Sequence, residues 1–117
     1  MRRVPGTLSN NNMKRSGVRE TYDLILEDLD YAIDYGPGYK DVFSASKGLA
    51  KGFKVEVLLL RGTDEDYAKV PELANEVLSN YEFKLEESFE DVFKNGYKST
   101  EIMFSILHPR IPSYHYR

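Results

Sequence analysis

The side chains that could take part in chemistry are few, and their spacing does not favour a catalytic site. The two histidines, His108 and His115, lie in a proline-broken C-terminal tail, where no regular element would bring them together as metal ligands. The chain has no cysteine, which excludes disulfides, thiol nucleophiles and metal clusters held by thiolates. It also lacks both glycine-rich motifs that bind nucleotide phosphates. We therefore predict no catalytic residue, no metal site and no cofactor, and we expect that the protein is not an enzyme.

Carboxylates could work as acid–base pairs or bind calcium, and they gather at two places. The first group comprises Asp23, Glu27, Asp28, Asp30 and Asp34, and the second is Asp64-Glu65-Asp66. Calcium loops place their oxygens on a tight irregular turn, whereas the first group follows a regular helical pattern. We interpret the first group as a solvated helix surface and the second as favourable charge at a helix N-terminus.

Aromatic side chains make up 13% of the sequence, as nine tyrosines and six phenylalanines. Those at helical core spacing are predicted to pack internally: Tyr22, Phe53, Tyr67, Phe89 and Phe93. Those outside the periodic segments are Tyr35, Tyr39, Tyr97, Tyr114 and Tyr116. These rings could be exposed platforms for sugars, or they could pack on another part of a larger protein, which we favour. The ligand-binding residues stay unknown at this point.

Composition excludes several classes of protein. With 117 residues the chain has the length of one domain. Its net charge of −3 lacks the basic excess of a nucleic-acid-binding protein. The longest apolar run, Val57–Leu60, is far shorter than the ~20 residues that cross a bilayer, so no transmembrane segment is expected. The N-terminal Met1–Gly6 has no apolar stretch after its arginines, so we expect no secretory signal on this chain.

Hydrophobic periodicity predicts three helices between residues 16 and 80, after an irregular arm at 1–15. The first spans 16–35, with Ser16 as a plausible N-cap, and Gly36-Pro37-Gly38 ends it with a glycine in the left-handed conformation. The second follows a cap at Ser44 or Ser46 and runs to about Arg61, although 55–60 could instead form a strand. The third follows 62–66 and ends at 79–80, and Pro71 should kink it or mark a later start.

The rest of the chain predicts short elements. Residues 81–85 alternate as an extended segment, and 88–94 form about two helical turns closed by Asn95-Gly96. Residues 101–106 are typical of a covered strand, and 108–117 form a tail. The fold class is thus mainly α with one or two short extended segments near the C-terminus. We treat 1–117 as a single partial domain: arm 1–15, helices 16–80, strand–helix–strand 81–107 and tail 108–117.

Six pieces of the sequence, in order, resemble the SusD/RagB family. Residues 18–33 are similar to its V-x-E-T-Y-x-x-I-x-x-D-L-D-x-A-I segment, and 46–62 to its K-G-A-A-K-A-L-x-A-R-V-x-L-Y-x-G helix. The other pieces are 73–78 with L-A-x-E-V-I, 81–85 with Y-x-L, 91–96 with D-L-F, and 101–106 with E-I-I-F-x-I, while Val4-Pro5 fits the V-P that precedes them. No single piece is specific, and the shared order carries the resemblance.

The resemblance implies a function and a setting. Family members are outer-membrane-anchored lipoproteins of Bacteroidota that bind glycans or other nutrients and work with a TonB-dependent transporter in polysaccharide utilization. Their scaffold contains tetratricopeptide-like antiparallel helices, and the second and third helices would form one such pair. The sequence departs from the family pattern at Gly52, Glu56 and Pro71. The chain is far shorter than family members, so we expect an internal segment whose lipid anchor, signal and ligand residues lie elsewhere in a full-length parent.

The leading hypothesis is therefore a non-catalytic fragment of a SusD-like nutrient-binding lipoprotein at the cell outer membrane. The alternative is a free-standing tetratricopeptide-like protein-interaction module, which would bind a protein segment in the groove between its helices. Neither hypothesis names a ligand residue in this chain.

Overall fold

The computed structural model describes residues 5–7, 9, 12–80 and 83–107. Its helices are α1 (Val18–Tyr35), α2 (Lys47–Arg61), α3 (Asp64–Asn80) and α4 (Phe89–Asn95), followed by the 3₁₀ turn η1 (Gly96–Lys98). The described residues contain no strand. The prediction of a mainly α chain is confirmed.

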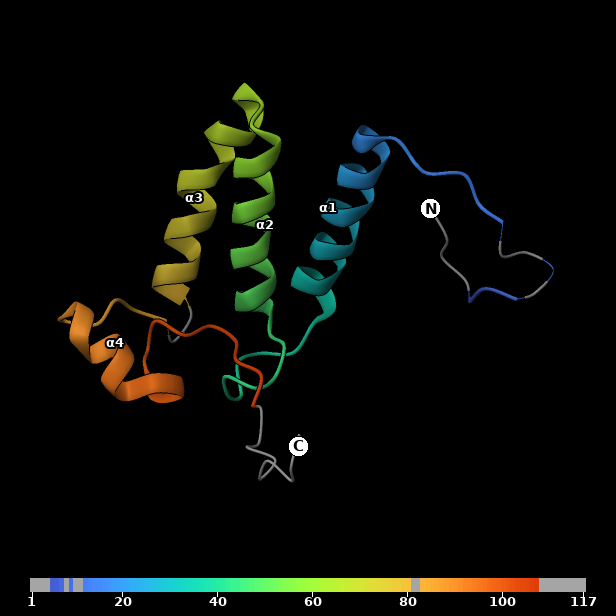
Figure 1. Cartoon of the computed structure of the whole chain (residues 1–117). Coiled ribbons are helices and arrows are strands. Elements are labelled where there is room, and N and C mark those ends of the chain that lie inside the picture. The colour runs from blue at the N-terminus through green and yellow to red at the C-terminus, as the bar shows by residue number, and fades with distance from the viewer. Residues whose placement is uncertain (1–4, 8, 10–11, 81–82, 108–117) are drawn as a thin grey trace, which may run out of the picture.

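The three long helices form a single layer with α2 at its centre (Figure 1). Neighbouring helices run antiparallel, and α1 and α3 each pack against α2 but not against each other. The shorter α4 and η1 lie beyond the end of the layer at which α3 ends. Antiparallel packing of α2 and α3 is compatible with a tetratricopeptide-like pair, and that finer classification stays a prediction.

The ends of α1 differ from the predicted caps. Gly17, and not Ser16, is the N-cap, and its carbonyl oxygen accepts from the amide (3.0 Å) and the hydroxyl (2.9 Å) of Thr21. At the other end Gly36 has φ −68° and ψ 166°, so the predicted left-handed glycine is wrong. The reason is the next residue, because Pro37 pushes the residue before it into the extended region.

The ends of α2 agree with the prediction. Ser46 is the N-cap, and its hydroxyl oxygen accepts a hydrogen bond from the amide of Leu49 at 3.2 Å. Gly62 closes the helix in the left-handed conformation, with φ 68°, and donates to the carbonyl of Leu58 at 2.9 Å. Residues 55–60 are helical, so the strand alternative is excluded.

Pro71 lies inside α3, which starts well before it at Asp64 and continues beyond it. The predicted later start is therefore wrong. Proline removes the donor that would bond to the carbonyl of Tyr67, and Pro71 is exposed, so water can reach this part of the helix.

The segment after η1 is irregular, and the predicted strand at 101–106 is wrong. Its backbone bonds to separate partners: the Ser105 amide donates to the Val42 carbonyl at 2.7 Å, and the Thr100 carbonyl accepts from the Lys84 amide at 3.1 Å. Two isolated bonds to different segments make no ladder. The extended segment predicted at 81–85 is no strand over 83–85 either, and residues 81–82 lie outside the described residues.

The hydrophobic interior is small. Five hydrophobic residues are buried among those described: Val42, Ala50, Leu58, Val77 and Phe83. Leu58, at 2% exposure, lies on α2 between its two neighbours. Many large apolar side chains stay exposed on all four α-helices.

Candidate functional site

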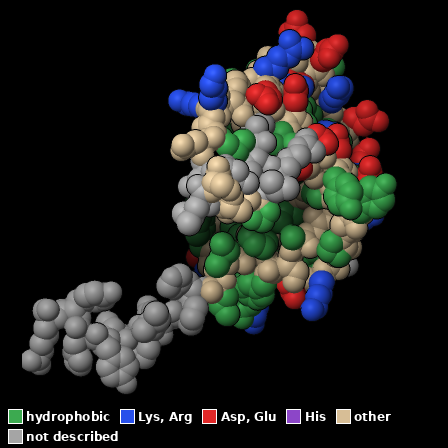
Figure 2. Space-filling model, turned by 90° about the vertical axis from the view of Figure 1, so that its right-hand side faces the viewer, with side chains coloured by type: hydrophobic (Ala, Val, Ile, Leu, Met, Phe, Trp, Pro, Cys, Tyr) green, Lys and Arg blue, Asp and Glu red, His purple; other side chains and the backbone are tan. Residues whose placement is uncertain are grey.

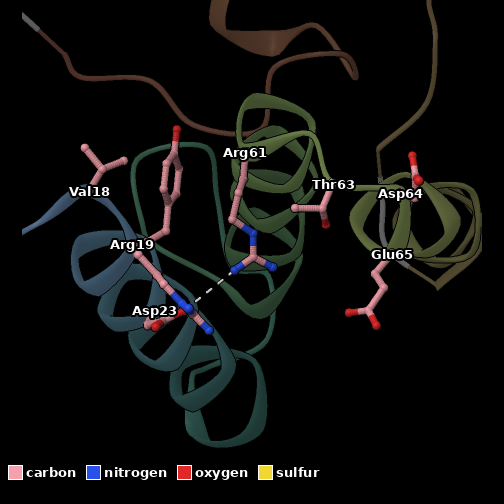
Figure 3. Close-up of a pocket in the computed structure, with 8 residues that line it drawn as sticks. Val18, Arg19, Asp23, Arg61, Thr63, Asp64 and Glu65 are labelled. Carbon is pink, nitrogen blue, oxygen red and sulfur yellow. Dashed lines mark ion pairs between the residues drawn. The ribbon is translucent and has the colours of Figure 1, made fainter.

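A cleft of about 730 Å³ opens where α1 begins, α2 ends and α3 begins (Figure 3). Eight residues line it: Val18, Arg19, Tyr22, Asp23, Arg61, Thr63, Asp64 and Glu65. Figure 2, viewed from the side of α1, shows charged side chains gathered toward this end of the molecule and hydrophobic side chains over the middle and lower surface.

The cleft rests on a charged pair whose carboxylate, that of Asp66, is buried. Arg61 donates from Nε to Asp66 Oδ2 at 2.7 Å and from Nη2 to Oδ1 at 2.5 Å, a bidentate geometry. The Asp66 carboxylate also accepts from the Thr63 amide at 3.2 Å, and the Asp66 amide donates to the Thr63 hydroxyl at 3.2 Å. This reciprocal pair is a capping box at the start of α3, with aspartate in place of the usual glutamate.

Asp66 is the anchor of this junction, since it is 0% exposed. Hydrogen bonds from the Arg61 guanidinium hold the pKa of the Asp66 carboxyl well below its ordinary value of 3.8, and those from Thr63 add to the effect, while burial opposes it. Arg61 also faces Asp23 on α1, Nη1 to Oδ1 at 3.7 Å, as the dashed line in Figure 3 marks. One guanidinium thus links all three long helices.

The other charged groups of the cleft surround an open space. Arg19, Asp23, Asp64 and Glu65 are exposed, and Figure 3 places Arg19 close to Asp23, with Asp64 and Glu65 on the far side beyond Arg61. The lining contains no nucleophile next to a general base. The most perturbed carboxyl, Asp66, is enclosed by its donors and cannot exchange a proton with a ligand. The geometry is that of a structural junction with a polar entrance.

A second hollow, of about 350 Å³, brings together aromatic rings that lie far apart in the sequence. Tyr39 meets Phe83 edge-on with ring centroids 5.3 Å apart, and Phe43 lies 5.6 Å from Tyr97. Tyr39 and Tyr97, two of the five rings that lie outside the periodic segments, therefore line one site. Tyr35 is exposed and pairs with Tyr31 at 4.7 Å, outside the lining of this hollow.

Two residues that line this hollow, Ser99 and Thr100, form hydrogen bonds with Glu86. The Ser99 hydroxyl, the Thr100 amide and the Asn95 side chain bond to its carboxylate and lower its pKa. The Glu86 amide in turn donates to Glu101 Oε1 at 2.9 Å. These bonds join the segment before α4 to the segment after η1. No sequence pattern indicates this cluster, because its members come from separate turns.

Four of the five aromatic residues predicted to pack internally are exposed. Tyr22 is half-buried, whereas Phe53, Tyr67, Phe89 and Phe93 are exposed, the last two by 82% and 70%. The packing prediction is wrong for these four. On α4 the reason is that the helix contacts η1 alone among the described helices, and its two rings lie against each other with their centroids 5.0 Å apart.

The acidic helix surface of α1 is exposed as predicted, and part of it has a further role. Asp30 pairs with Lys54 of α2, the Asp34 carbonyl accepts from Lys47 at 3.0 Å, and Asp23 faces Arg61. Lys51 pairs with Glu76 of α3. We call Lys47, Lys51, Lys54 and Arg61 the basic stripe of α2, since they are spaced i, i+4, i+7 and i+14 along one side. The sequence analysis did not identify this stripe, although the helical spacing of its four residues can be recognised in the sequence.

Asp64, Glu65 and Asp66 were predicted to lie at a helix N-terminus, and this is confirmed because α3 begins at Asp64. The prediction missed the burial of Asp66. The T-x-x-D spacing of Thr63 and Asp66 was the signal that could have indicated it.

Four of the side chains singled out in the sequence cannot be placed. His108, His115, Tyr114 and Tyr116 lie outside the described residues. Within residues 5–7, 9, 12–80 and 83–107, no group of three or more side chains could hold a metal ion, and no helix has the length and apolar character to cross a membrane.

No family model, curated protein or solved structure matches this chain.

Proposed function

We propose that this chain is a segment of a SusD-like nutrient-binding lipoprotein of the outer membrane, in which it serves as a non-catalytic helical scaffold. The parent protein would capture a glycan or another nutrient and work with a TonB-dependent transporter. The ordered likeness of the six sequence pieces supports this proposal, and so does the antiparallel pairing of α2 and α3 across Gly62.

One structural observation carries the scaffold role. Among the described residues five hydrophobic side chains are buried, while large apolar side chains are exposed on every α-helix, including Leu60 at 70% and Phe89 at 82%. Exposed apolar surface of this extent is a feature of proteins that bury it against another body. The two hollows lack catalytic machinery, so support of other parts fits this chain better than chemistry.

The proposal is tested by locating the protein in its native host. The parent protein, epitope-tagged within this segment and expressed from its own locus, should be recovered in the outer-membrane fraction, and a TonB-dependent transporter should co-purify with it. Recovery in another fraction without a transporter would contradict the proposal.

A glycan array probed with the 117-residue chain provides a second test of the proposed function. The scaffold role predicts that the chain alone binds no glycan, because the ligand residues lie elsewhere in the parent. Binding by the chain alone, lost on Tyr97→Ala but retained by Tyr35→Ala, would assign the sugar site to the aromatic hollow and refute this part of the proposal.

A second candidate function is a tetratricopeptide-like protein-interaction module. It is favoured by a groove of about 440 Å³ between α1 and α2, lined by Arg15, Ser16, Val18, Thr21, Tyr22, Ile25, Val57 and Leu60. Grooves between helices are common docking sites for protein segments. Binding of any peptide in this groove would support the module.

A further inference from the structure

The layer of α1, α2 and α3 has two unlike faces. On one face the basic stripe of α2 meets Asp23 and Asp30 of α1 and Glu76 of α3. Residues advance by about 100° along an α-helix, so the side of α2 opposite the basic stripe carries Phe53, Glu56 and Leu60.

The neighbouring helices add apolar side chains to that second side. Val18 and Ile25 of α1 lie away from the acidic residues that meet α2, and they line the groove with Val57 and Leu60. On α3, Tyr67 and Leu78 share a stripe that is turned away from Glu76. We call Val18, Ile25, Phe53, Leu60, Tyr67 and Leu78 the apolar face, and all six are exposed.

The chain itself covers one end of this side of α2. A Cβ atom at Gly52 would lie 2.8 Å from Met103 Cε, so the segment after η1 packs closely on the first half of α2. The groove lies at the other half, near the start of α1 and the end of α2, where Leu60 is exposed.

A single carboxylate lies within the apolar face. Glu56 is exposed and is spaced i+3 from Phe53 and i−4 from Leu60. Its side chain forms no ion pair or hydrogen bond within the described part of the chain. A partner that covers this face must supply a cation there, because an unpaired buried charge is costly.

We propose that the apolar face docks an amphipathic α-helix of a partner protein, whose apolar stripe carries one lysine or arginine opposite Glu56. The inference rests on the second function proposed above, the protein-interaction module. It specifies the shape and the charge of the segment that the module binds.

The structure favours a helix over other occupants. An extended strand would need an open sheet edge, and the face is made of helices whose backbone groups bond internally. Grooves between antiparallel helices instead accept the side-chain ridge of another helix. The new helix would begin the second layer that this single layer lacks.

Charge argues against two other occupants. A two-fold dimer through this face would bring the two copies of Glu56 toward each other, and like charges oppose such contact. An anionic membrane surface would meet the same carboxylate on a chain of net charge −3. A helix with a basic residue in its apolar stripe satisfies both the apolar surface and Glu56.

The test uses the full 117-residue chain and a set of fluorescein-labelled peptides of about 20 residues, long enough to form a helix. All carry leucines at i, i+3, i+4 and i+7, and the central residue of that stripe is lysine, leucine or glutamate. Fluorescence anisotropy should show the lysine peptide binding at least about tenfold more tightly than the glutamate peptide.

Charge reversal makes the test specific. Glu56→Lys should invert the preference, so that the glutamate peptide binds more tightly, while Glu72→Lys on α3 makes the same change in net charge away from the face and should leave the preference unaltered. Circular dichroism checks that both variants stay helical. Leu60→Asp should weaken binding of all three peptides.

Two further outcomes separate this inference from the module. A lysine peptide with two central prolines cannot form the helix, and equal binding of this peptide would overturn the helical occupant while supporting the module. Absence of binding by every peptide would refute both. Three other outcomes would each overturn the inference. The first is equal affinity for the lysine and glutamate peptides. The others are sedimentation of the chain as a dimer through this face, and binding to phosphatidylserine vesicles that Leu60→Asp abolishes.

Discussion

Arg61 and Asp66, five residues apart, hold each other by two hydrogen bonds across the turn between α2 and α3. The carboxylate is inaccessible to solvent, and the same guanidinium faces Asp23 of α1. The chain thus fixes the relative position of its three long helices at one end of the layer by a single charged junction.

Acid should weaken this junction. The pKa of Asp66 is lower in the folded chain than its ordinary value of 3.8, so its stabilising contribution is complete above that pH. It is lost as the pH falls from about 4 through the lower folded-state pKa. Urea unfolding at pH 7, 4 and 3 should show a falling midpoint, and Asp66→Asn should be destabilised at pH 7 and less sensitive to acid. An equal acid loss in Asp66→Asn and wild type would contradict this role.

Leu58 should be the most sensitive apolar position of α2. It is 2% exposed, so Leu58→Ala removes buried methyl groups and leaves a cavity, with a loss of about 2–5 kcal/mol in the free energy of unfolding. Leu60→Ala, the same change at an exposed position on the same helix, should cost below about 0.5 kcal/mol. Denaturant unfolding of both variants measures the difference, and similar losses would show that the assignment of the interior is wrong.

A side chain at Gly62 should destabilise the turn between α2 and α3. It has φ 68°, and a Cβ atom there would lie 2.8 Å from the Tyr67 hydroxyl oxygen. Gly62→Ala should therefore lower the unfolding free energy by at least about 1 kcal/mol. The same change in a Tyr67→Ala background removes the nearby hydroxyl, so it separates backbone strain from the clash. Equal effects would assign the whole loss to the backbone.

The N-cap of α2 should contribute more than that of α4. Ser46 is buried and bonds to the Leu49 amide, so Ser46→Ala should cost about 1 kcal/mol in the free energy of unfolding. Ser88 makes the corresponding bond to the Asp91 amide on a short helix that contacts η1 alone among the helices. Ser88→Ala should cause a small loss of helical circular dichroism, because only α4 is affected, and it should leave the midpoint of denaturant unfolding nearly unchanged. A larger loss for Ser88→Ala would contradict the peripheral position of α4.

The long helices were predictable because local signals determine them. The apolar period of α1, the Ser46 cap and Gly62 each act within a few residues, and the structure places these elements within two residues of the prediction. The irregular conformation of residues 101–106 could not be predicted from their sequence, because an apolar segment forms a strand only where a partner strand lies beside it. The single bond from Ser105 to Val42 shows that none does among the described residues.

The site was less predictable than the fold. The sequence predicts Asp66 only as one of three favourable charges at a helix N-terminus, because its burial depends on the position of Arg61 across a turn. Phe89 and Phe93 have the spacing of a helix interior, and periodicity cannot tell whether a second body covers that side. For the same reason the sequence left open whether the non-periodic tyrosines are sugar platforms or pack on another part of a larger protein, and it did not indicate that Tyr39 and Tyr97 line one hollow.

The claim that this layer is a scaffold within an outer-membrane assembly is tested most directly by photo-cross-linking in the native host. A photoreactive phenylalanine analogue replaces Leu60 on the apolar face, and the same analogue at Glu72 serves as the control. We predict a cross-linked adduct from position 60 in the outer-membrane fraction, together with a TonB-dependent transporter, and no such adduct from position 72. A chain that stays free of adducts at position 60 and outside the outer membrane would contradict the account.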